Sequence, residues 1–179
     1  MNQQAEILEG GTPPRPTLTG AMREEAVRKT IAAHPVLFSD DIDSDAVESG
    51  IATLVKELRF HDDGFELAKA VERDWWNVDA EVVEILDGLS ETADNILREA
   101  VKYWVNEFDV MPVFSPGTRV TWRQNGKQVA GVICVHEIEI YYSQAFYVIR
   151  EDGRNYPGNG GGGTIVAYEL CTAEQVAEA

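Results

Sequence analysis

The hydrophobic pattern of the chain changes at Met111 and Pro112, and this change constrains the fold more than any other feature. Before it, apolar residues recur at intervals of three and four residues, which is the spacing of amphipathic helices. After it, they alternate with polar residues between closely spaced turn signals, which is typical of β-strands. The chain has 179 residues, enough for one compact domain or two small ones. The sequence therefore predicts an α+β protein in which a helical bundle is followed by a small antiparallel β-barrel.

This pattern predicts three regions. Residues 1–20 contain several prolines and glycines and no apolar period, which indicates a flexible tail or an extended arm. Residues 21–110 are predicted to form an acidic helical domain. Residues 111–179 are predicted to form the β-barrel, with a short C-terminal helix from about Thr172.

The helical domain contains five segments with helical spacing. They begin at Ala21, after Ser39, at Gly64, after Asp79 and after Ser90. Asp79 is a suitable N-cap, and Gly88 stands where a left-handed residue would end the fourth segment. Because the link between Gly88 and Ser90 is so short, we expect the last two helices to pack antiparallel.

The charge of the chain is strongly negative and unevenly distributed. There are 31 acidic and 15 basic residues, a net charge of −16, and residues 1–110 carry −14 of it. Double-stranded DNA carries about one negative charge per 1.7 Å, so it would repel a region of this charge. We therefore expect no direct nucleic-acid binding by the N-terminal half, whereas its charge would attract a protein with a basic surface. The alternative is that the charge serves only solubility.

The densest acidic stretch is the first candidate for partner binding. It comprises Asp40, Asp41, Asp43, Asp45 and Glu48, joined by Asp62 and Asp63. Carboxylates in a line can mimic nucleic-acid phosphates for a basic partner. The alternative is a solvated helix start, because the helix dipole favours acids in the first turn.

The same aspartates do not predict a metal site. Asp41, Asp43 and Asp45 fit the first positions of a calcium-binding loop, but Ala46 replaces the required glycine and Ala52 the bidentate glutamate. The three histidines and two cysteines show none of the paired short spacings of structural zinc sites. We expect neither a metal nor a cofactor.

Four strands are predicted in the C-terminal region. They span Arg119–Arg123, Lys127–His136, Ala145–Glu151 and Thr164–Leu170. Asn125-Gly126 predicts a tight hairpin between the first two, and Gly131 permits a sharp bend in the second. Four or five strongly bent strands in about 60 residues suit a small barrel.

This region carries a resemblance that extends from Phe114 to Cys171. The residues that carry it are Pro116-Gly117, Val120, Trp122, Gly126-Lys127, Gly131, Tyr147-Val148-Ile149, Asp152-Gly153 and Tyr168-Glu169-Leu170. Together they resemble the pattern of SH3-like and Tudor-like small barrels of bacterial and phage proteins. The resemblance implies an SH3-like barrel that binds a peptide or a nucleic acid, although fold alone does not decide activity. The glycines at 160–163 depart from this pattern.

The aromatic residues of the barrel are the second candidate for partner binding. Tyr141, Tyr142, Phe146 and Tyr147 surround the loop before the third strand, and Trp122 is near them in sequence. In a Tudor-like barrel, loop aromatics of this kind can form a cage for a cationic side chain. The alternative is that they fill the core and rim of the barrel.

The sequence does not predict an enzyme. Cys134 and His136 would share one strand face, but same-face neighbours lie about 6.5–7 Å apart and their side chains stand parallel. We therefore interpret Cys134 as a buried thiol. No nucleophile, base and orienting group stand at a plausible spacing.

The sequence also predicts where the protein resides. No apolar stretch approaches the roughly 18 residues of a membrane-spanning helix, and Met1–Gly11 has no basic segment followed by an apolar one. Two cysteines without a disulfide framework favour a reducing compartment. We expect a cytoplasmic protein that is not associated with a membrane.

Two functions fit these observations. The first is a non-enzymatic inhibitor or adaptor of the phage or mobile-element type, for example an anti-defence protein such as an anti-CRISPR, whose acidic helices bind a basic nucleic-acid-handling protein. The second is a peptide- or nucleic-acid-binding module that acts through the barrel. Its basic residues are Arg119, Arg123, Lys127, Arg150 and Arg154. The partner and the oligomeric state do not follow from the sequence.

Overall fold

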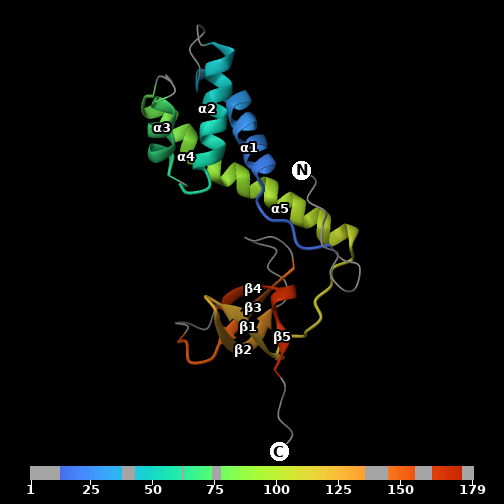
Figure 1. Cartoon of the computed structure of the whole chain (residues 1–179). Coiled ribbons are helices and arrows are strands. Elements are labelled where there is room, and N and C mark those ends of the chain that lie inside the picture. Colours follow the sequence, from blue (N-terminus) through green and yellow to red (C-terminus); the bar gives the residue numbers. More distant parts are fainter. Residues whose placement is uncertain are drawn as a thin grey trace, which may run out of the picture. The chain divides into compact units, whose positions relative to one another are not determined.

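A computed structural model describes residues 13–37, 43–61, 63–73, 78–135, 145–155 and 163–174 (Figure 1). Within these residues the chain is α+β, with five α-helices followed by five β-strands. It forms two compact units. The helical unit comprises residues 16–100, and the β unit comprises the residues from Val101 onward together with the N-terminal segment that ends at Arg15.

The division between the units lies inside a helix. The sequence pattern predicts a domain boundary after residue 110, where helical spacing changes to strand spacing. The compact units divide after Ala100. The reason is that Trp104 contacts Pro13 and Arg15, so the last turns of this helix are held within the β unit. The described end of the predicted tail is likewise in contact with folded residues.

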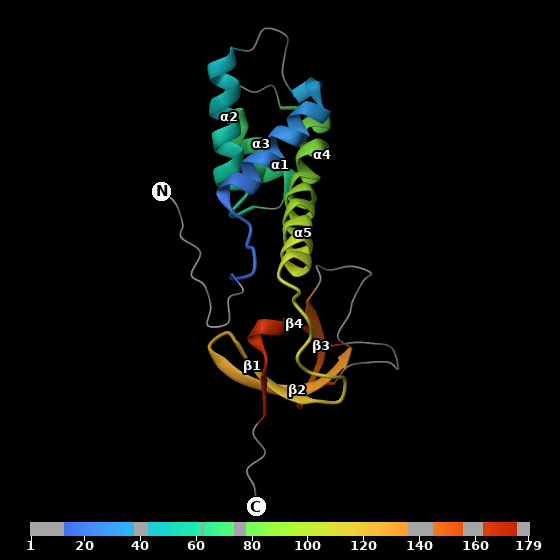
Figure 2. The same ribbon diagram turned by 90° about the vertical axis from the view of Figure 1, so that its right-hand side faces the viewer.

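The helices occupy the predicted places. They are α1 (Gly20–Ala33), α2 (Ser44–Glu57), α3 (Gly64–Glu72), α4 (Ala80–Asp87) and α5 (Leu89–Glu107), and a 3-10 turn at Pro35–Leu37 follows α1. In the helical unit α1 packs on α2, α2 on α3 and α3 on α4 (Figure 2). The fully buried side chains that join them are Leu54, Leu67, Val71, Leu86 and Leu89. Apolar residues at helical spacing therefore form one core, as expected for amphipathic helices.

Polar side chains fix where four of these helices begin. The side chains of Thr19, Asp43, Asp63 and Asp79 accept backbone N–H groups at the starts of α1, α2, α3 and α4, respectively. The N-cap predicted at Asp79 is confirmed by a 3.0 Å hydrogen bond from the Val82 N–H. Each cap satisfies a backbone donor that has no partner inside the helix.

A glycine permits the closest approach between α3 and α4. A Cβ on Gly64 would collide with the backbone oxygen of Val83, and the Gly64 N–H donates to Oδ1 of Asp87 at 2.6 Å. Any larger residue at the first position of α3 would force the two helices apart.

The expected arrangement of α4 and α5 is wrong. Gly88 joins them with φ −77° and ψ −8°, which is right-handed helical geometry and not the left-handed end that we predicted. A single residue in this geometry cannot reverse the chain direction, so α4 and α5 do not pack antiparallel, and α4 packs on α3 instead.

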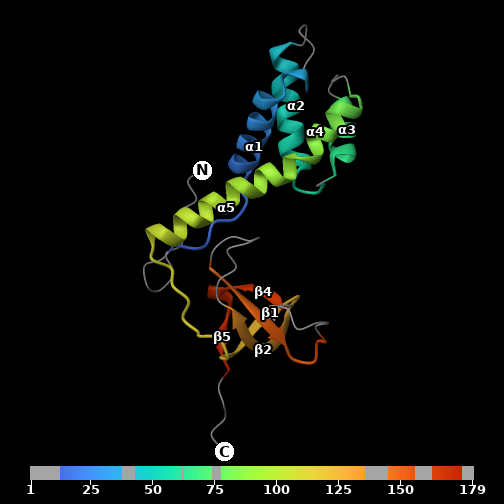
Figure 3. The same cartoon turned by 180° about the vertical axis from the view of Figure 1, so that it is seen from behind.

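The β unit contains one antiparallel sheet. Its strands are β1 (Arg119–Gln124), β2 (Lys127–Val135), β3 (Phe146–Glu151), β4 (Thr164–Ala167) and β5 (Thr172–Ala173). They lie in the order β4-β3-β2-β1-β5. Figure 3 shows the sheet from the side opposite to that of Figure 1. The hairpin predicted at Asn125-Gly126 is confirmed, and both residues have the positive φ of a tight hairpin turn, 50° and 77°. At Gly131, where a bend is predicted, β2 approaches the backbone of β3 too closely for a Cβ.

The C-terminal end of the sheet differs from the prediction. The fourth strand ends at Ala167 and continues as a 3-10 turn, Tyr168–Leu170. The helix predicted from Thr172 is wrong at its start, because Thr172 pairs with Thr121 of β1. A local pattern could not reveal this pairing, since it depends on a strand far away in the sequence.

No helix among the described residues is long and apolar enough to cross a membrane.

Candidate functional site

The N-terminal segment of the β unit lies against the end of α5. The indole Nε1 of Trp104 donates a hydrogen bond of 2.9 Å to the carbonyl oxygen of Pro13. Trp104 is buried, so this hydrogen bond satisfies the one polar group of its side chain. Proline at 13, 14 and 16 favours an extended backbone here and leaves the segment's carbonyl groups available as acceptors.

The side chain of Arg15, two residues after Pro13, is held against two aromatic rings. Its guanidinium carbon lies 4.4 Å from the ring centroid of Phe146 in β3 and 5.3 Å from that of Trp104 in α5. Both distances fall within the range in which a cation is attracted by the negative face of an aromatic ring. The side chain of Arg15 is only 14% exposed, so this attraction is weakly screened by water.

The edges of the same guanidinium group are hydrogen-bonded. Nε of Arg15 donates to Oε1 of Glu169 at 2.6 Å, and Nη2 donates to the carbonyl oxygen of Ala145 at 2.6 Å. Nη2 also lies 3.4 Å from Oε2 of Glu169. Charge-assisted hydrogen bonds of this kind are stronger than neutral ones. We call Trp104, Ala145, Phe146 and Glu169 the guanidinium site.

The backbone at Ala145 shapes one wall of the guanidinium site. Ala145 has φ 66°, a left-handed conformation that costs a residue with a Cβ about 1–2 kcal/mol. Its carbonyl oxygen accepts both the Arg15 guanidinium and the backbone N–H of Tyr168, the latter at 3.1 Å. Tyr168 begins the 3-10 turn that carries Glu169. One carbonyl therefore ties the start of β3 to the turn that supplies the carboxylate.

The described residues of the predicted aromatic cage, Trp122, Phe146 and Tyr147, have different surroundings. Phe146 is half-buried and contacts a cation, as an aromatic cage would require. Tyr147 and Trp122 are instead core residues, 0% and 4% exposed, and Tyr147 packs on Tyr168 with ring centroids 4.3 Å apart. The alternation of a strand explains this difference, because neighbouring residues of β3 point to opposite faces. The other two predicted cage residues, Tyr141 and Tyr142, lie outside the described residues.

The sequence analysis missed most of the guanidinium site. It did not single out Arg15, Trp104 or Glu169, which come from three distant parts of the chain. The available signal was an arginine between prolines, which is typical of an extended recognition segment. Trp104 had the spacing of an ordinary core position on its helix and gave no signal of its own.

The predicted acidic residues have local partners. Asp43 and Asp63 are N-caps, and Asp45 lies in the first turn of α2. Glu48 accepts two hydrogen bonds from Arg28, at 3.0 and 2.8 Å, and the hydrogen bonding lowers the pKa of the Glu48 carboxyl. All four of these carboxylates are exposed. The remaining predicted acids, Asp40, Asp41 and Asp62, lie outside the described residues.

A second group of acids runs along α4 and the start of α5. We call it the acidic stripe, and it comprises Glu81, Glu84, Asp87, Glu91 and Asp94, all exposed. Their spacings of three and four residues make them neighbours on a helix surface. This spacing is present in the sequence, but the stripe was not predicted as a binding site, because its acids are less dense than the aspartates near residue 43.

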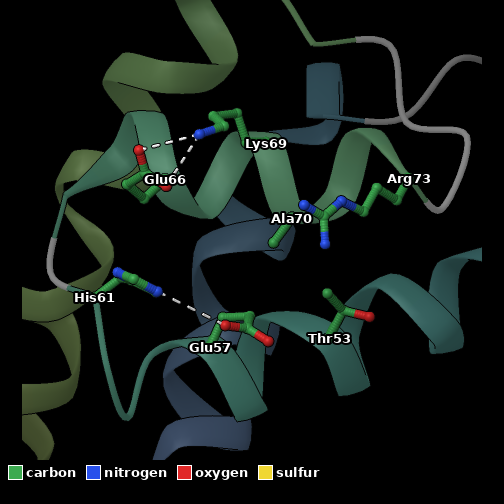
Figure 4. A pocket seen from close by; sticks show the side chains of 7 residues that line it. All are labelled: Thr53, Glu57, His61, Glu66, Lys69, Ala70 and Arg73. Atoms are coloured by element: carbon green, nitrogen blue, oxygen red, sulfur yellow. Dashed lines mark hydrogen bonds and ion pairs between the residues drawn. The ribbon is translucent and has the colours of Figure 1, made fainter.

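A polar pocket of about 340 Å³ lies between α2 and α3 (Figure 4). Its lining residues are Thr53, Glu57, His61, Glu66, Lys69, Ala70 and Arg73. Lys69 donates to Glu66 at 3.2 Å, and Nε2 of His61 lies 3.8 Å from Oε2 of Glu57. These charges largely compensate one another. Within the described ranges no three His, Cys, Asp or Glu side chains come together as metal ligands.

The two cysteines differ in burial. Cys171 is buried, and burial raises the pKa of its thiol to about 11, so it stays protonated at neutral pH. Cys134 is half-buried and its thiol donates to the carbonyl oxygen of Val132 at 3.6 Å. Its neighbour His136 lies outside the described residues.

No protein-family model, curated protein or solved structure matches the chain. Two features therefore remain as the basis for a function. The helical unit offers exposed carboxylates, and the β unit offers an aromatic and acidic site that holds a guanidinium group.

Proposed function

We propose that the protein is a non-enzymatic interaction protein, an inhibitor or adaptor whose acidic helical unit binds a basic partner that handles nucleic acids. Residues 16–100 contain 20 acidic and 8 basic residues, a net charge of −12. A surface of this charge repels nucleic acid and speeds encounter with positively charged protein surfaces. The proposed partner surface is one that normally binds phosphates.

The exposure of the acidic stripe carries this proposal. Between Asp79 and Glu99 the chain has seven acidic residues and one basic residue, Arg98, and all seven acids are exposed. The Asp43 and Asp63 side chains cap helices and remain exposed as well. A helix fixes the spacing of the residues that carry these carboxylates, so a partner meets them in a defined register.

The experiment is affinity capture with the intact chain at low and at high salt. We expect a basic partner that is retained at low salt and lost at high salt, because screening weakens interactions between exposed charges. The test variant Glu91→Gln with Asp94→Asn removes two charges of the stripe. The matched control, Glu107→Gln with Asp109→Asn, removes two exposed charges at the end of α5.

The stripe variant should capture several-fold less partner at low salt, and the control should capture as much as the natural chain. The predicted aspartate cluster is tested separately by changing Asp40, Asp41, Asp43 and Asp45 to lysine. Capture that none of these variants changes at low salt would contradict the proposal.

A second candidate function is peptide binding through the β unit, which we propose to be an SH3-like barrel. The return of β5 to β1 and the close approach of β2 to β3 at Gly131 support this fold. The guanidinium site supports a peptide as ligand. Nucleic acid is less favoured, because Arg119 is paired with Asp152 and Glu174, both within 2.6 Å. Salt-dependent binding of single- or double-stranded nucleic acid by the intact chain would reverse this preference.

A further inference from the structure

We propose that the guanidinium site binds arginine side chains of proline-flanked peptides in a partner protein, and that the chain's own segment Pro13–Pro16 occupies this site as an intramolecular ligand. The inference rests on the second candidate function, peptide binding by the β unit. It specifies the class of the ligand, and it states that the chain's own segment occupies the site when no partner is bound.

The guanidinium site offers both aromatic rings and hydrogen-bond acceptors to a guanidinium group. The guanidinium carbon lies over the rings of Phe146 and Trp104, and two of its nitrogens donate to Glu169 and to the Ala145 carbonyl. A lysine ammonium has no planar face and cannot donate to a carboxylate and a carbonyl in this fork geometry. The site therefore distinguishes arginine from lysine, as a recognition site would.

The segment also defines the backbone of the ligand. Trp104 donates to the carbonyl of Pro13, which stands two residues before the arginine. Prolines beside the arginine hold the backbone extended at little entropic cost, as in other proline-rich recognition segments. We therefore expect a ligand with a free carbonyl two residues before its arginine and with proline beside the arginine.

A peptide of a partner protein can replace the segment in the guanidinium site. The hydrogen bonds between the segment and the site are made by Arg15 and by the Pro13 carbonyl, while Pro13 and Pro16 are half-buried and Pro14 is exposed. A peptide with the same arginine, carbonyl and prolines can make the same hydrogen bonds. As an attached ligand the segment has an effective concentration of about a millimolar, which a partner must overcome. Removal of Arg15 should therefore open the site.

The test uses the full chain and a fluorescent peptide with the sequence of residues 12–17, Thr-Pro-Pro-Arg-Pro-Thr. We expect the Arg15→Ala chain to bind it at least about tenfold more tightly than the natural chain, because the attached competitor is gone. A peptide with lysine in place of its arginine should bind about tenfold more weakly to the same variant. Fluorescence anisotropy measures both affinities.

The site itself is tested by adding Glu169→Gln or Phe146→Leu to Arg15→Ala, and either change should abolish binding. Circular dichroism establishes that each variant is folded, and Arg15→Lys is the host if Arg15→Ala does not fold. The proposal is overturned by a folded host that binds no peptide, by equal affinity of the natural and Arg15-substituted chains, or by equal affinity for the arginine and lysine peptides.

The peptide-binding test and the affinity-capture test of the acidic surface can succeed or fail independently. The stripe variant Glu91→Gln with Asp94→Asn should leave peptide affinity unchanged, since it alters no residue of the guanidinium site. Failure of the peptide test with retained salt-sensitive capture would reject only the peptide site. Peptide binding without such capture would reject only the acidic surface.

Discussion

Nε of Arg15 donates to Oε1 of Glu169 at 2.6 Å, across a sequence separation of 154 residues. This contact attaches the N-terminal segment to the 3-10 turn between β4 and β5. The guanidinium group also covers the ring of Phe146 at the start of β3. One side chain thus connects a proline-rich segment to two parts of the sheet.

Replacement of this arginine should destabilise the β unit. Arg15→Ala removes a shielded cation–π contact and leaves the Glu169 carboxylate without this partner, for an expected loss of about 1–3 kcal/mol. Arg15→Lys should recover less than half of the loss, because a single ammonium nitrogen cannot replace both Nε and Nη2 and lacks the planar guanidinium group. Urea denaturation measures the difference, and Thr17→Ala, an exposed position, is the control. An unchanged midpoint for Arg15→Ala would show that the contact contributes nothing.

Replacement by alanine should change the stability in opposite directions at Gly64, which packs on α4, and at Gly88, which follows α4. Gly64→Ala places a Cβ against the Val83 backbone and should cost more than about 2 kcal/mol. Gly88→Ala has room, with its nearest neighbour at 3.5 Å, and a helical φ of −77°. It should raise stability by about 0.5–1 kcal/mol, because alanine loses less backbone entropy. Thermal unfolding of both variants tests the pair, and equal effects would contradict the close approach of α3 and α4.

The cap of α3 gives a third prediction. Oδ1 of Asp63 accepts the N–H groups of Phe65 at 2.8 Å and Glu66 at 3.2 Å. Asp63→Ala should therefore cost about 1 kcal/mol, whereas Asp63→Asn, which is also a good N-cap, should cost at most a few tenths. The comparison removes the charge in both variants, so denaturant midpoints isolate the hydrogen bonds. Equal losses would mean that the carboxylate acts by charge and not by capping.

The two thiols should differ in reactivity. Burial raises the pKa of Cys171 to about 11 from an ordinary value of 9.0, which lowers its thiolate fraction about a hundredfold near pH 8. Only Cys134 should react with iodoacetamide in the folded chain, and Cys171 should react after unfolding. Mass spectrometry of the labelled peptides identifies the site. Rapid labelling of Cys171 in the folded chain would contradict its burial.

The same shift gives a pH dependence of stability. Between about pH 9 and 11 the folded chain keeps the Cys171 proton while the unfolded chain releases it. The unfolded state therefore binds fewer protons, and the free energy of unfolding falls as the pH rises through this window. Cys171→Ala should reduce this part of the alkaline loss of stability in urea titrations.

Features encoded by neighbouring residues could be predicted from the sequence. The Asp79 cap and the Asn125-Gly126 hairpin depend on local backbone geometry, and both are present. The joint at Gly88 was misjudged, because glycine permits both left-handed and right-handed geometry and the packing of α4 on α3 decides between them. Propensity alone could not make that choice.

Features that depend on distant pairs could not be predicted. The strand at Thr172 exists because it pairs with Thr121, and the contact of Arg15 with Glu169 of the guanidinium site joins residues 154 positions apart in the sequence. Of the residues of the guanidinium site, only Phe146 was among the predicted cage residues. It contacts the Arg15 guanidinium because the alternation of β3 turns it away from the core that holds Tyr147.

The occupancy of the guanidinium site by Arg15 is the central claim, and nuclear magnetic resonance tests it most directly. The measurement compares the indole N–H signal of Trp104 in the natural chain, in Arg15→Ala and in the exposed control Thr17→Ala. We expect this signal to shift in Arg15→Ala alone, because the segment leaves and the hydrogen bond to Pro13 is lost. A Trp104 signal that is the same in all three chains would contradict the claim that the N-terminal segment fills the site.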